Sequence, residues 1–370
     1  MKEIRRLSAA FLLASASISP VQAAGGGDPF AFLLLQTDAR PASLGGAYAA
    51  AVDDANAVFY NPAGLADQRR HNTVFMHNKQ FEGINQETAA LGFRQGWGIG
   101  INYLSVGDIP RTTVSNPGGS GLSSFDSSDL ALAGGYGRRV SGSVSLGSSL
   151  KYVRSEIDGV SAVGVGLDIG GKMDLAPLIE HRVSLGFGVG NVGIAQPQFN
   201  NRKETLPAFV RMGVAYRVEP IEGHALLAVF DLNRQMSDNF TFHPGVEWKV
   251  RDRISMRLGY DGRNDAGTGV TTGVGWSFKD FGLNYAFVPF GDLGDAHKIS
   301  LSYRWGPDEG PTKMSRGPSA TGRKEMKRSS IMPEIQELPK YREPTYKPLP
   351  EEDNRPKRPR YFDADKSIGG

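Results

Sequence analysis

The stretch Val144-Ser-Leu-Gly-Ser-Ser-Leu-Lys-Tyr152 alternates large apolar residues with Ser, Gly and Lys, and Val163-Gly-Val-Gly-Leu-Asp-Ile-Gly170 does the same with Gly and Asp. Successive side chains of a β-strand point to opposite faces, so a period of two predicts strands with one apolar face. An amphipathic helix would instead repeat its apolar residues every three or four positions. The chain is therefore expected to consist mainly of strands.

The same alternation recurs between residues 71 and 305, where we count fourteen such runs. Their ranges are 71–78, 85–93, 97–106, 125–137, 141–155, 159–174, 182–193, 208–218, 222–232, 241–251, 253–262, 267–278, 281–289 and 296–304. Most have 9 to 12 residues. A tilted strand needs about 9–11 residues to cross a bilayer, whereas strands of soluble proteins usually have about 5–6. An even number of long strands favours an antiparallel barrel that spans a membrane.

The face of these strands that is not apolar distinguishes a membrane barrel from a soluble sandwich. In a soluble sandwich that face meets water and is rich in Lys, Glu and Thr, whereas here Gly and Ser dominate it. Small residues suit a narrow lumen that houses another segment, so the apolar face is expected to contact outer-membrane lipid. The candidates for polar lumenal residues are Arg211, Glu247, Lys249 and Arg257. A secreted soluble all-β protein is the alternative.

Composition excludes several classes of site. The chain of 370 residues has no Cys, which rules out disulfide scaffolds, thiolate metal sites and cysteine nucleophiles. A net charge of +3 gives no electrostatic footprint for nucleic acid. The six His lack metal-ligand spacing, and Gly188-Val-Gly-Asn-Val-Gly193 is not followed by the helix that a dinucleotide site needs. We expect no catalytic, cofactor-binding or metal-binding residues, and no enzymatic activity.

The two ends of the chain differ from its middle. Residues 1–23 combine Lys and Arg with a short apolar run and end in small residues, which is typical of a cleaved secretory signal peptide. Residues 306–370 are rich in Pro and charge and poor in aliphatic residues, so we expect a disordered tail. Both ends of an even-stranded outer-membrane barrel lie on the periplasmic side. The tail is therefore predicted to hang in the periplasm, and it is long enough to reach a periplasmic partner.

Residues 24–70 do not alternate, and we expect them to form a plug ahead of the barrel, which covers 71–305. Ser43 is expected to cap an Ala-rich helix that runs to about Val58, and Pro62 to begin a second short helix. This plug has two alternative locations, the periplasm and the lumen of the barrel. Its small side chains favour the lumen. Asp53 and Asp54 are expected to pin it to lumenal Arg or Lys residues rather than to act as acid and base. The Asn-Pro pair at 61–62 is interpreted as a turn that fixes the chain. The alternative is a hinge that moves when a ligand passes.

Two stretches of the plug carry a family resemblance. Ala39-Arg-Pro-Ala-Ser-Leu-Gly-Gly-Ala-Tyr-Ala49 and Asp53-Asp-Ala-Asn-Ala-Val-Phe-Tyr-Asn-Pro-Ala-Gly-Leu65 resemble the N-terminal signature of the PorV/PorQ group of UPF0164-type proteins. The second stretch is also similar to the hatch motif of the wider FadL superfamily of outer-membrane transporters. The residues that match this motif are Asp53, Asp54, Asn56, Asn61, Pro62 and Gly64. The resemblance extends over residues 38–305 and implies a fourteen-stranded outer-membrane barrel with a small helical hatch in its lumen.

The resemblance implies two alternative functions. A PorV-like protein would bind secreted cargo proteins or secretion machinery and shuttle the cargo to surface attachment in type IX secretion. A FadL-like protein would instead transport a hydrophobic small molecule, which displaces the hatch and leaves through the wall. The connection at 109–124 is polar and rich in Gly and Ser. A lipid-collecting loop would be more apolar, so this loop favours the protein shuttle slightly.

Overall fold

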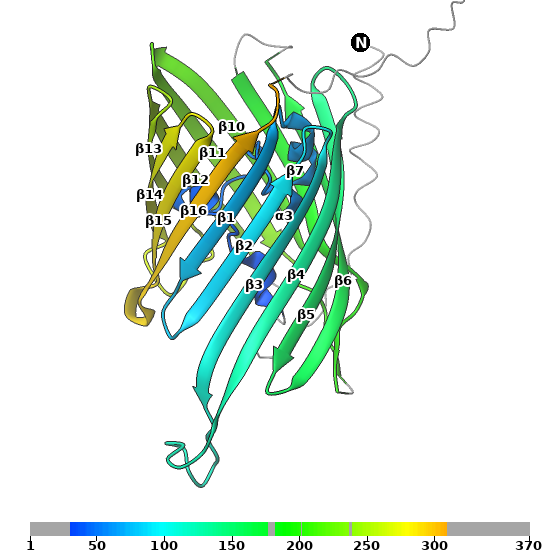
Figure 1. Ribbon diagram of the computed structural model, residues 1–370, viewed down its shortest axis with the longest axis vertical. Helices are drawn as coiled ribbons and strands as arrows, with labels where there is room; N and C mark the ends of the chain where they lie inside the picture. Colours follow the sequence, from blue (N-terminus) through cyan, green and yellow to red (C-terminus); the bar gives the residue numbers. More distant parts are fainter. Residues whose placement is uncertain (1–29, 177–181, 201, 237–238, 309–370) are drawn as a thin grey trace, which may run out of the picture. The chain divides into compact units, whose positions relative to one another are not determined.

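The structure, a computed structural model, describes residues 30–176, 182–200, 202–236 and 239–308. Fourteen long strands form a closed antiparallel barrel, in which β1 (His71–Lys79) pairs with β16 (Asp295–Trp305) to complete the ring (Figure 1). The predicted fold class and the number of strands are confirmed. The predictions for residues 1–29 and 309–370, which include the signal peptide and most of the tail, concern segments outside the described residues.

Twelve further strands make up the rest of the wall. They are β2 (Ile84–Gly92), β3 (Trp97–Pro110), β4 (Ser124–Arg139), β5 (Val144–Ile157), β6 (Val160–Asp174), β7 (Arg182–Ala195), β10 (Phe209–Ile221), β11 (His224–Gln235), β12 (Phe240–Val250), β13 (Ile254–Tyr260), β14 (Val270–Phe278) and β15 (Phe281–Pro289). Two short strands that the sequence did not predict, β8 (Gln198–Phe199) and β9 (Arg202–Lys203), form a separate hairpin between β7 and β10. The expected run 253–262 ends early because the chain turns inward after Tyr260 and buries Asp261.

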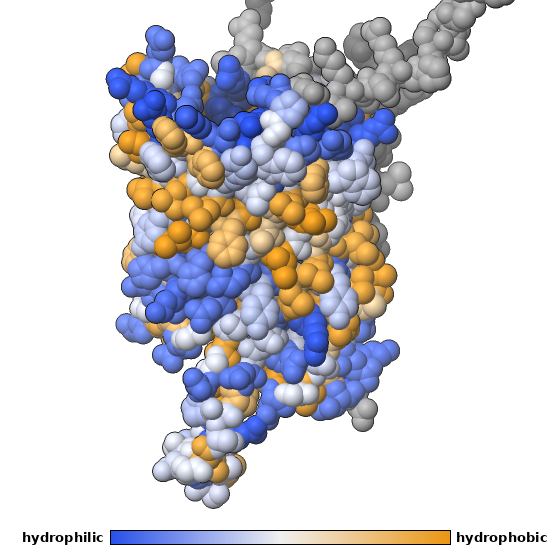
Figure 2. All heavy atoms as spheres, viewed as in Figure 1, coloured by the Kyte–Doolittle hydropathy of each residue, from blue (hydrophilic) through white to orange (hydrophobic). Residues whose placement is uncertain are grey.

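The outer face of the wall carries apolar side chains and the inner face carries small or polar ones, as the alternation on β5 shows. Leu146 and Leu150 are each about half exposed (51% and 52%), whereas their neighbours Ser145 and Ser149 are buried (3% and 2%). On the visible face of the molecule apolar side chains gather across the middle, and hydrophilic ones dominate near the upper rim (Figure 2). An apolar belt between polar rims is the outer surface that a barrel in a bilayer needs.

The barrel has two distinct ends. We call the end where β1 begins and β16 ends the terminal end, and the end with the 111–123 connection between β3 and β4 the loop end (Figure 1). None of the helices in the described ranges is long and apolar enough to cross a membrane. One of them, η4 (Gly291–Leu293), lies in the connection between β15 and β16.

Residues 30–70 lie inside the barrel and form the plug. Its helical turns are η2 (Ala31–Leu34), α2 (Ala39–Ser43), α3 (Ala57–Tyr60) and η3 (Pro62–Asp67). Helix α2 packs against β13 to β16, and η3 packs against β4 to β6 on another part of the wall. The plug therefore bridges the lumen from one side to the other.

The predicted helix from Ser43 to Val58 is wrong. Ser43 is instead the last residue of α2, and the chain then runs through turns. Gly45 has φ 69°, and a side chain there would overlap the backbone of Tyr260, so the plug turns sharply against the wall at this point. The Asp231 carboxylate on β11 then accepts hydrogen bonds from the N–H groups of Tyr48 and Ala49, each at 2.9 Å. The wall thus satisfies backbone groups that a helix would have paired internally.

The second predicted helix start is confirmed, because η3 begins at Pro62. The side chain of Asn61 accepts a hydrogen bond from the N–H of Ala63 at 3.2 Å, as an N-capping residue does. Proline suits the first helical position since it lacks the N–H that would have no partner there. This short turn is the part of the plug that contacts β4, β5 and β6.

Candidate functional site

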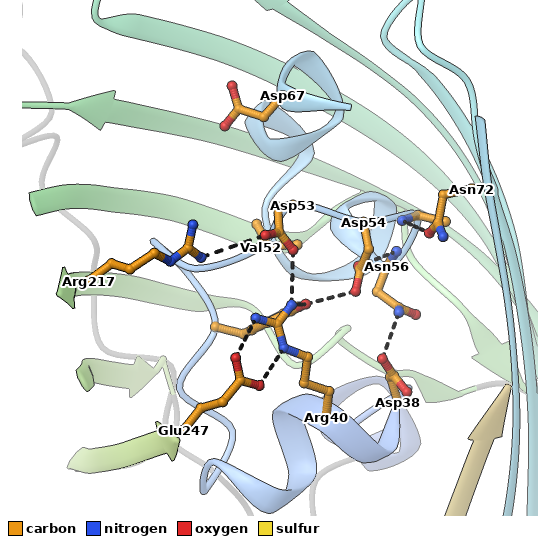
Figure 3. A network of polar contacts seen from close by, with 12 residues as sticks. Asp38, Arg40, Val52, Asp53, Asp54, Asn56, Asp67, Asn72, Arg217 and Glu247 are labelled. Carbon is orange, nitrogen blue, oxygen red and sulfur yellow. Dashed lines mark hydrogen bonds and ion pairs between the residues drawn. The ribbon is translucent and has the colours of Figure 1, made fainter. Parts of the chain in front are cut away.

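Arg40 of α2 lies at the centre of the polar contacts between the plug and the wall (Figure 3). Its guanidinium binds Glu247 of β12 through two hydrogen bonds, Nε to Oε2 at 3.0 Å and Nη2 to Oε1 at 3.2 Å. Its Nη1 also donates to Asp53 Oδ1 and to the Tyr48 hydroxyl, both at 3.0 Å. Arg257 of β13 binds the same Glu247 oxygen at 2.6 Å. We call Arg40, Asp53, Glu247 and Arg257 the latch.

Three of the four latch side chains are removed from solvent. Side-chain exposure is 14% for Arg40, 5% for Glu247 and 4% for Arg257, but 42% for Asp53. A buried ion pair costs desolvation, and removing one partner leaves an uncompensated charge that costs about 3–5 kcal/mol. Loss of Arg40 or Glu247 is therefore expected to be costly, whereas Asp53 contributes less because water screens it.

Asp54 and Asn56 continue the network away from the latch (Figure 3). The Tyr48 hydroxyl donates to Asp54 at 2.7 Å, and the Asn56 side chain donates to Asp38 at 3.1 Å. Asp38 in turn accepts a hydrogen bond from the Ser300 hydroxyl on β16. Asp53 and Asp54 thus have different partners and do not converge on one point. Asp53 binds Arg40 of the plug and lies 3.8 Å from Arg217 of the wall, whereas Asp54 binds Tyr48 of the plug. Pinning of the plug to the wall by these two aspartates stays a prediction.

Burial, together with the nearby carboxylates of Asp38 and Asp53, raises the pKa of Asp54 to about 7. Asp53 behaves in the opposite way: burial opposes its charge, but Arg40, Arg217 and Lys172 hold the pKa of Asp53 below its usual value. In the unfolded chain an aspartate titrates near pH ~4. Between about pH 4 and 7 the native state therefore binds the extra proton, and stability falls as the pH rises through this window.

This sign gives a testable pH dependence. The contribution of Asp54 to the free energy of unfolding is expected to fall by about 1–2 kcal/mol between pH 5.5 and 8, less than the full shift because Asp54 is partly open to solvent. Asp54→Asn cannot ionise and is expected to flatten that slope. Urea unfolding of both proteins in detergent across this range measures it. An unchanged slope in Asp54→Asn would contradict the assignment.

Asn61, Pro62 and Gly64 hold the opposite side of the plug. The Asn61 side chain donates to two backbone oxygens, of Ala49 at 2.8 Å and of Gly171 on β6 at 3.1 Å. A side chain at Gly64 would come within 2.7 Å of Val52, so a glycine is needed for the close approach of the two plug turns. The Asn-Pro pair joins the plug to the wall as a fixed turn in this structure.

Two anchors of the plug were not predicted from the sequence. Asp67 at the end of η3 pairs with Arg139 at 2.7 Å and with Lys172 at 2.8 Å. Lys172 also donates to the carbonyl of Val52 at 2.7 Å. Asn72 on β1 accepts the N–H of Ala55 at 2.8 Å. These residues are scattered single polar positions, and the only signal in the sequence is their place on the inward face of a strand or just before one.

The four predicted lumenal residues separate into two groups. Glu247 and Arg257 belong to the latch, and Lys249 is half-buried on the same strand as Glu247 and faces the terminal end. Arg211 of β10 lies apart from them, where it donates to Asn233 at 3.1 Å.

A cavity of about 1020 Å³ opens beside the latch, and we call it the vestibule. Its wall is charged with both signs, and the charged residues that line it include Arg40, Asp53, Asp67, Lys172, Arg217 and Lys249. Arg69, Arg70 and Arg304, which flank the ends of β1 and β16, also line it, so it lies toward the terminal end. Within the described ranges no three His, Asp or Glu side chains gather as they would around a metal ion.

A cluster of apolar side chains lies inside the barrel between the start of the plug and the wall. Phe30 and Phe32 pack there with Val153 of β5 and with Leu206, and all four are buried. Phe199 of the β8–β9 hairpin stacks on Phe30 with ring centroids 6.0 Å apart. The lumen thus holds a charged vestibule and, separately, an apolar cluster that the chain fills with its own phenylalanines.

Comparison with known proteins finds similarity in the first part of the chain. Residues 8–165 match the model of an uncharacterised protein family, UPF0164. A UPF0164 protein of Treponema pallidum (strain Nichols) is 30% identical over 143 residues, which cover 36% of this chain and 35% of the relative. The residues that match the family model include the plug and β1 to β5. The chain spans only about a third of the length of the curated relative.

Solved structures resemble the barrel at low sequence identity. The Ralstonia pickettii toluene transporter TbuX has a TM-score of 0.50 at 13% identity, with 73% of this chain and 98% of that chain covered. A Pseudomonas aeruginosa FadL homologue has a TM-score of 0.47 at 12% identity, with 73% and 98% covered. The likeness to TbuX concerns the fold alone: this chain forms a closed β-barrel similar to that of the toluene transporter.

Proposed function

We propose that the protein is a non-enzymatic outer-membrane channel that admits hydrophobic small molecules and is closed at rest by its plug. The observation that carries this proposal is the apolar cluster inside the barrel. An apolar site within a lumen that is otherwise polar suits an apolar ligand, because such a ligand gains free energy by leaving water there. Phe30 and Phe32 occupy the space that the ligand would take.

The vestibule determines the route that such a ligand would follow. An apolar molecule gains nothing from a cavity lined by ions, which keep their hydration. We therefore propose that the ligand displaces the segment around Phe32 and leaves sideways through the wall rather than through the vestibule. That the toluene transporter TbuX shares this fold is in keeping with the proposal.

Phe32→Ala tests this function. Phe32 is 4% exposed within the apolar cluster, so its removal is expected to leave an apolar cavity that accepts toluene. Toluene uptake into proteoliposomes is expected to rise about fivefold or more over wild type. The reason is that toluene no longer has to displace the phenyl ring, whose burial contributes about 1 kcal/mol or more. Phe75→Ala, which truncates a ring that is 47% exposed on the outer face, is the matched control and is expected to leave uptake unchanged. Equal uptake by both variants would contradict the proposal.

A second function, the binding and shuttling of secreted proteins as the PorV resemblance implies, is favoured by the loop end. The 111–123 connection is polar and extends from the barrel, and Val114 within it is fully exposed. Purification from outer membranes in mild detergent, with mass spectrometry of what copurifies, distinguishes the two functions. Secreted proteins with a shared C-terminal domain would support the shuttle, and a stoichiometric apolar compound without protein partners would support the channel.

A further inference from the structure

A second, much smaller cavity of about 20 Å³ lies between the plug and the wall. Plug residues from Leu33 to Thr37 line one side, and Lys151 of β5 and Arg211 of β10 line the other. Arg263, from the turn after β13, also reaches it. A volume of this size holds a single water molecule or one small ion.

The charge around this cavity is one-sided. Three cationic side chains line it, and no Asp or Glu is among the described residues that do so. Lys151 is compensated, because its Nζ lies 2.7 Å from a carboxylate oxygen of Asp168. The two guanidinium groups are not compensated in this way.

Arg211 is 7% exposed and forms no direct ion pair among the described residues, although Asp231 and Asp168 are near enough to attract its charge. Its hydrogen bonds go to the neutral oxygens of Asn233 at 3.1 Å and of the Tyr60 backbone at 3.5 Å. Arg263, whose side chain is 24% exposed, forms a long ion pair with Asp261 at 3.8 Å, and its Nε has no hydrogen-bond partner. Arg211 and Arg263 are also close enough to repel one another. Arg211 is buried without a hydrogen-bonded carboxylate, and Arg263 has an unpartnered Nε, so a small anion in the cavity would lower the cost of burying these cations.

Thr37 supplies the second observation. It is 4% exposed and lines the cavity, and its hydroxyl has no hydrogen-bond partner although its N–H is bound by the Tyr60 hydroxyl at 3.2 Å. A buried hydroxyl without a partner costs free energy, and this one is free to donate to an anion. Thr37 belongs to the plug and Arg211 to the wall, so an ion between them would join the two.

We propose that this cavity binds one halide ion, chloride under physiological conditions, held by Arg211, Arg263 and the Thr37 hydroxyl. The ion supplies the negative charge that the lining lacks, and it fits the volume where a larger anion does not. It binds only while the plug is seated, because Thr37 and Arg211 meet only then. Chloride therefore stabilises the closed barrel, independently of which ligand or cargo the protein handles.

The test measures thermal unfolding of the full-length protein in detergent, in sodium gluconate against sodium chloride or bromide at constant ionic strength. The midpoint is expected to rise by about 5 °C at saturating halide, since a ligand bound only by the native state stabilises it. Arg211→Gln is expected to weaken the apparent halide affinity about tenfold or more. Crystals grown in bromide are expected to show an anomalous peak in the cavity.

Thr37→Val is a second variant that tests the proposal if Arg211→Gln does not fold. It removes an unpaired hydroxyl, so it is expected to raise the midpoint in gluconate and to reduce the halide response. Thr271→Val is the matched control: Thr271 is buried on the lumenal face and accepts the N–H of Gly45 at 3.1 Å, away from the cavity. It is expected to lower the midpoint equally in both salts. Equal midpoints of the wild type in gluconate and chloride, or a full halide response in Thr37→Val, would overturn the proposal.

Discussion

Arg40→Met is expected to release the plug while the barrel stays folded. The substitution keeps most of the side-chain volume but removes the cation that Glu247 and Asp53 share. Because the Arg40–Glu247 pair is buried and doubly hydrogen-bonded, we expect plug seating to weaken by about 3 kcal/mol or more. In planar lipid bilayers the wild type is expected to conduct rarely, and the variant to show frequent open steps.

Arg217→Met is the matched control for this prediction. Arg217 also faces Asp53, but the two groups are 3.8 Å apart and the Arg217 side chain is 47% exposed. An exposed ion pair contributes about 0–1 kcal/mol, so its loss is expected to change conductance little. Similar conductance in the two variants would show that the latch does not hold the plug.

Gly186→Ala is expected to force the plug away from β7. A methyl group at this position would overlap the backbone carbonyl of Ala49 in the plug, and the backbone on both sides cannot yield as a side chain can. Overpacking of this kind costs about 1–3 kcal/mol. A lower free energy of unfolding in urea, together with faster proteolysis of the plug, is the expected result.

Gly188→Ala on the same strand and the same face provides the comparison. A methyl group there would lie 3.7 Å from the Ile169 carbonyl and 3.9 Å from that of Tyr60, which are ordinary contacts. We expect stability within about 0.5 kcal/mol of wild type. Should Gly188→Ala prove as damaging as Gly186→Ala, strand propensity rather than plug contact would explain both results.

Much of the barrel could be predicted because alternation is a local property. The position of Leu150 beside Ser149 already indicates which face is apolar, and fourteen such runs fix the size of the ring. The plug could not be predicted in the same way. Its Ala-rich stretch has good helix propensity, but Asp231, far away in the sequence, captures the N–H groups of Tyr48 and Ala49. Tertiary contacts override propensity there.

The site shows the same division. The predicted residues Asp53, Glu247 and Arg257 do meet, but the residue that joins them is Arg40, which no prediction singled out. Arg40 and Glu247 are 207 positions apart in the sequence. Alternation predicts which face of a strand a residue lies on, but it does not predict which residue contacts it from across the lumen. The sequence also could not predict that Arg211 lies beside the halide cavity rather than in the latch.

Cysteine labelling on β5 in native outer membranes tests the central claim most directly, because the chain has no Cys of its own. Leu150→Cys and Ser149→Cys are adjacent on β5, with the wild-type side chains 52% and 2% exposed. A fluorophore at position 150 is expected to be quenched by spin-labelled lipid, whereas position 149, packed against the plug, is expected to react poorly with lipid-soluble and water-soluble reagents alike. Rapid reaction of position 150 with a water-soluble reagent, without quenching by lipid, would contradict a barrel that faces the membrane and is closed by its own plug.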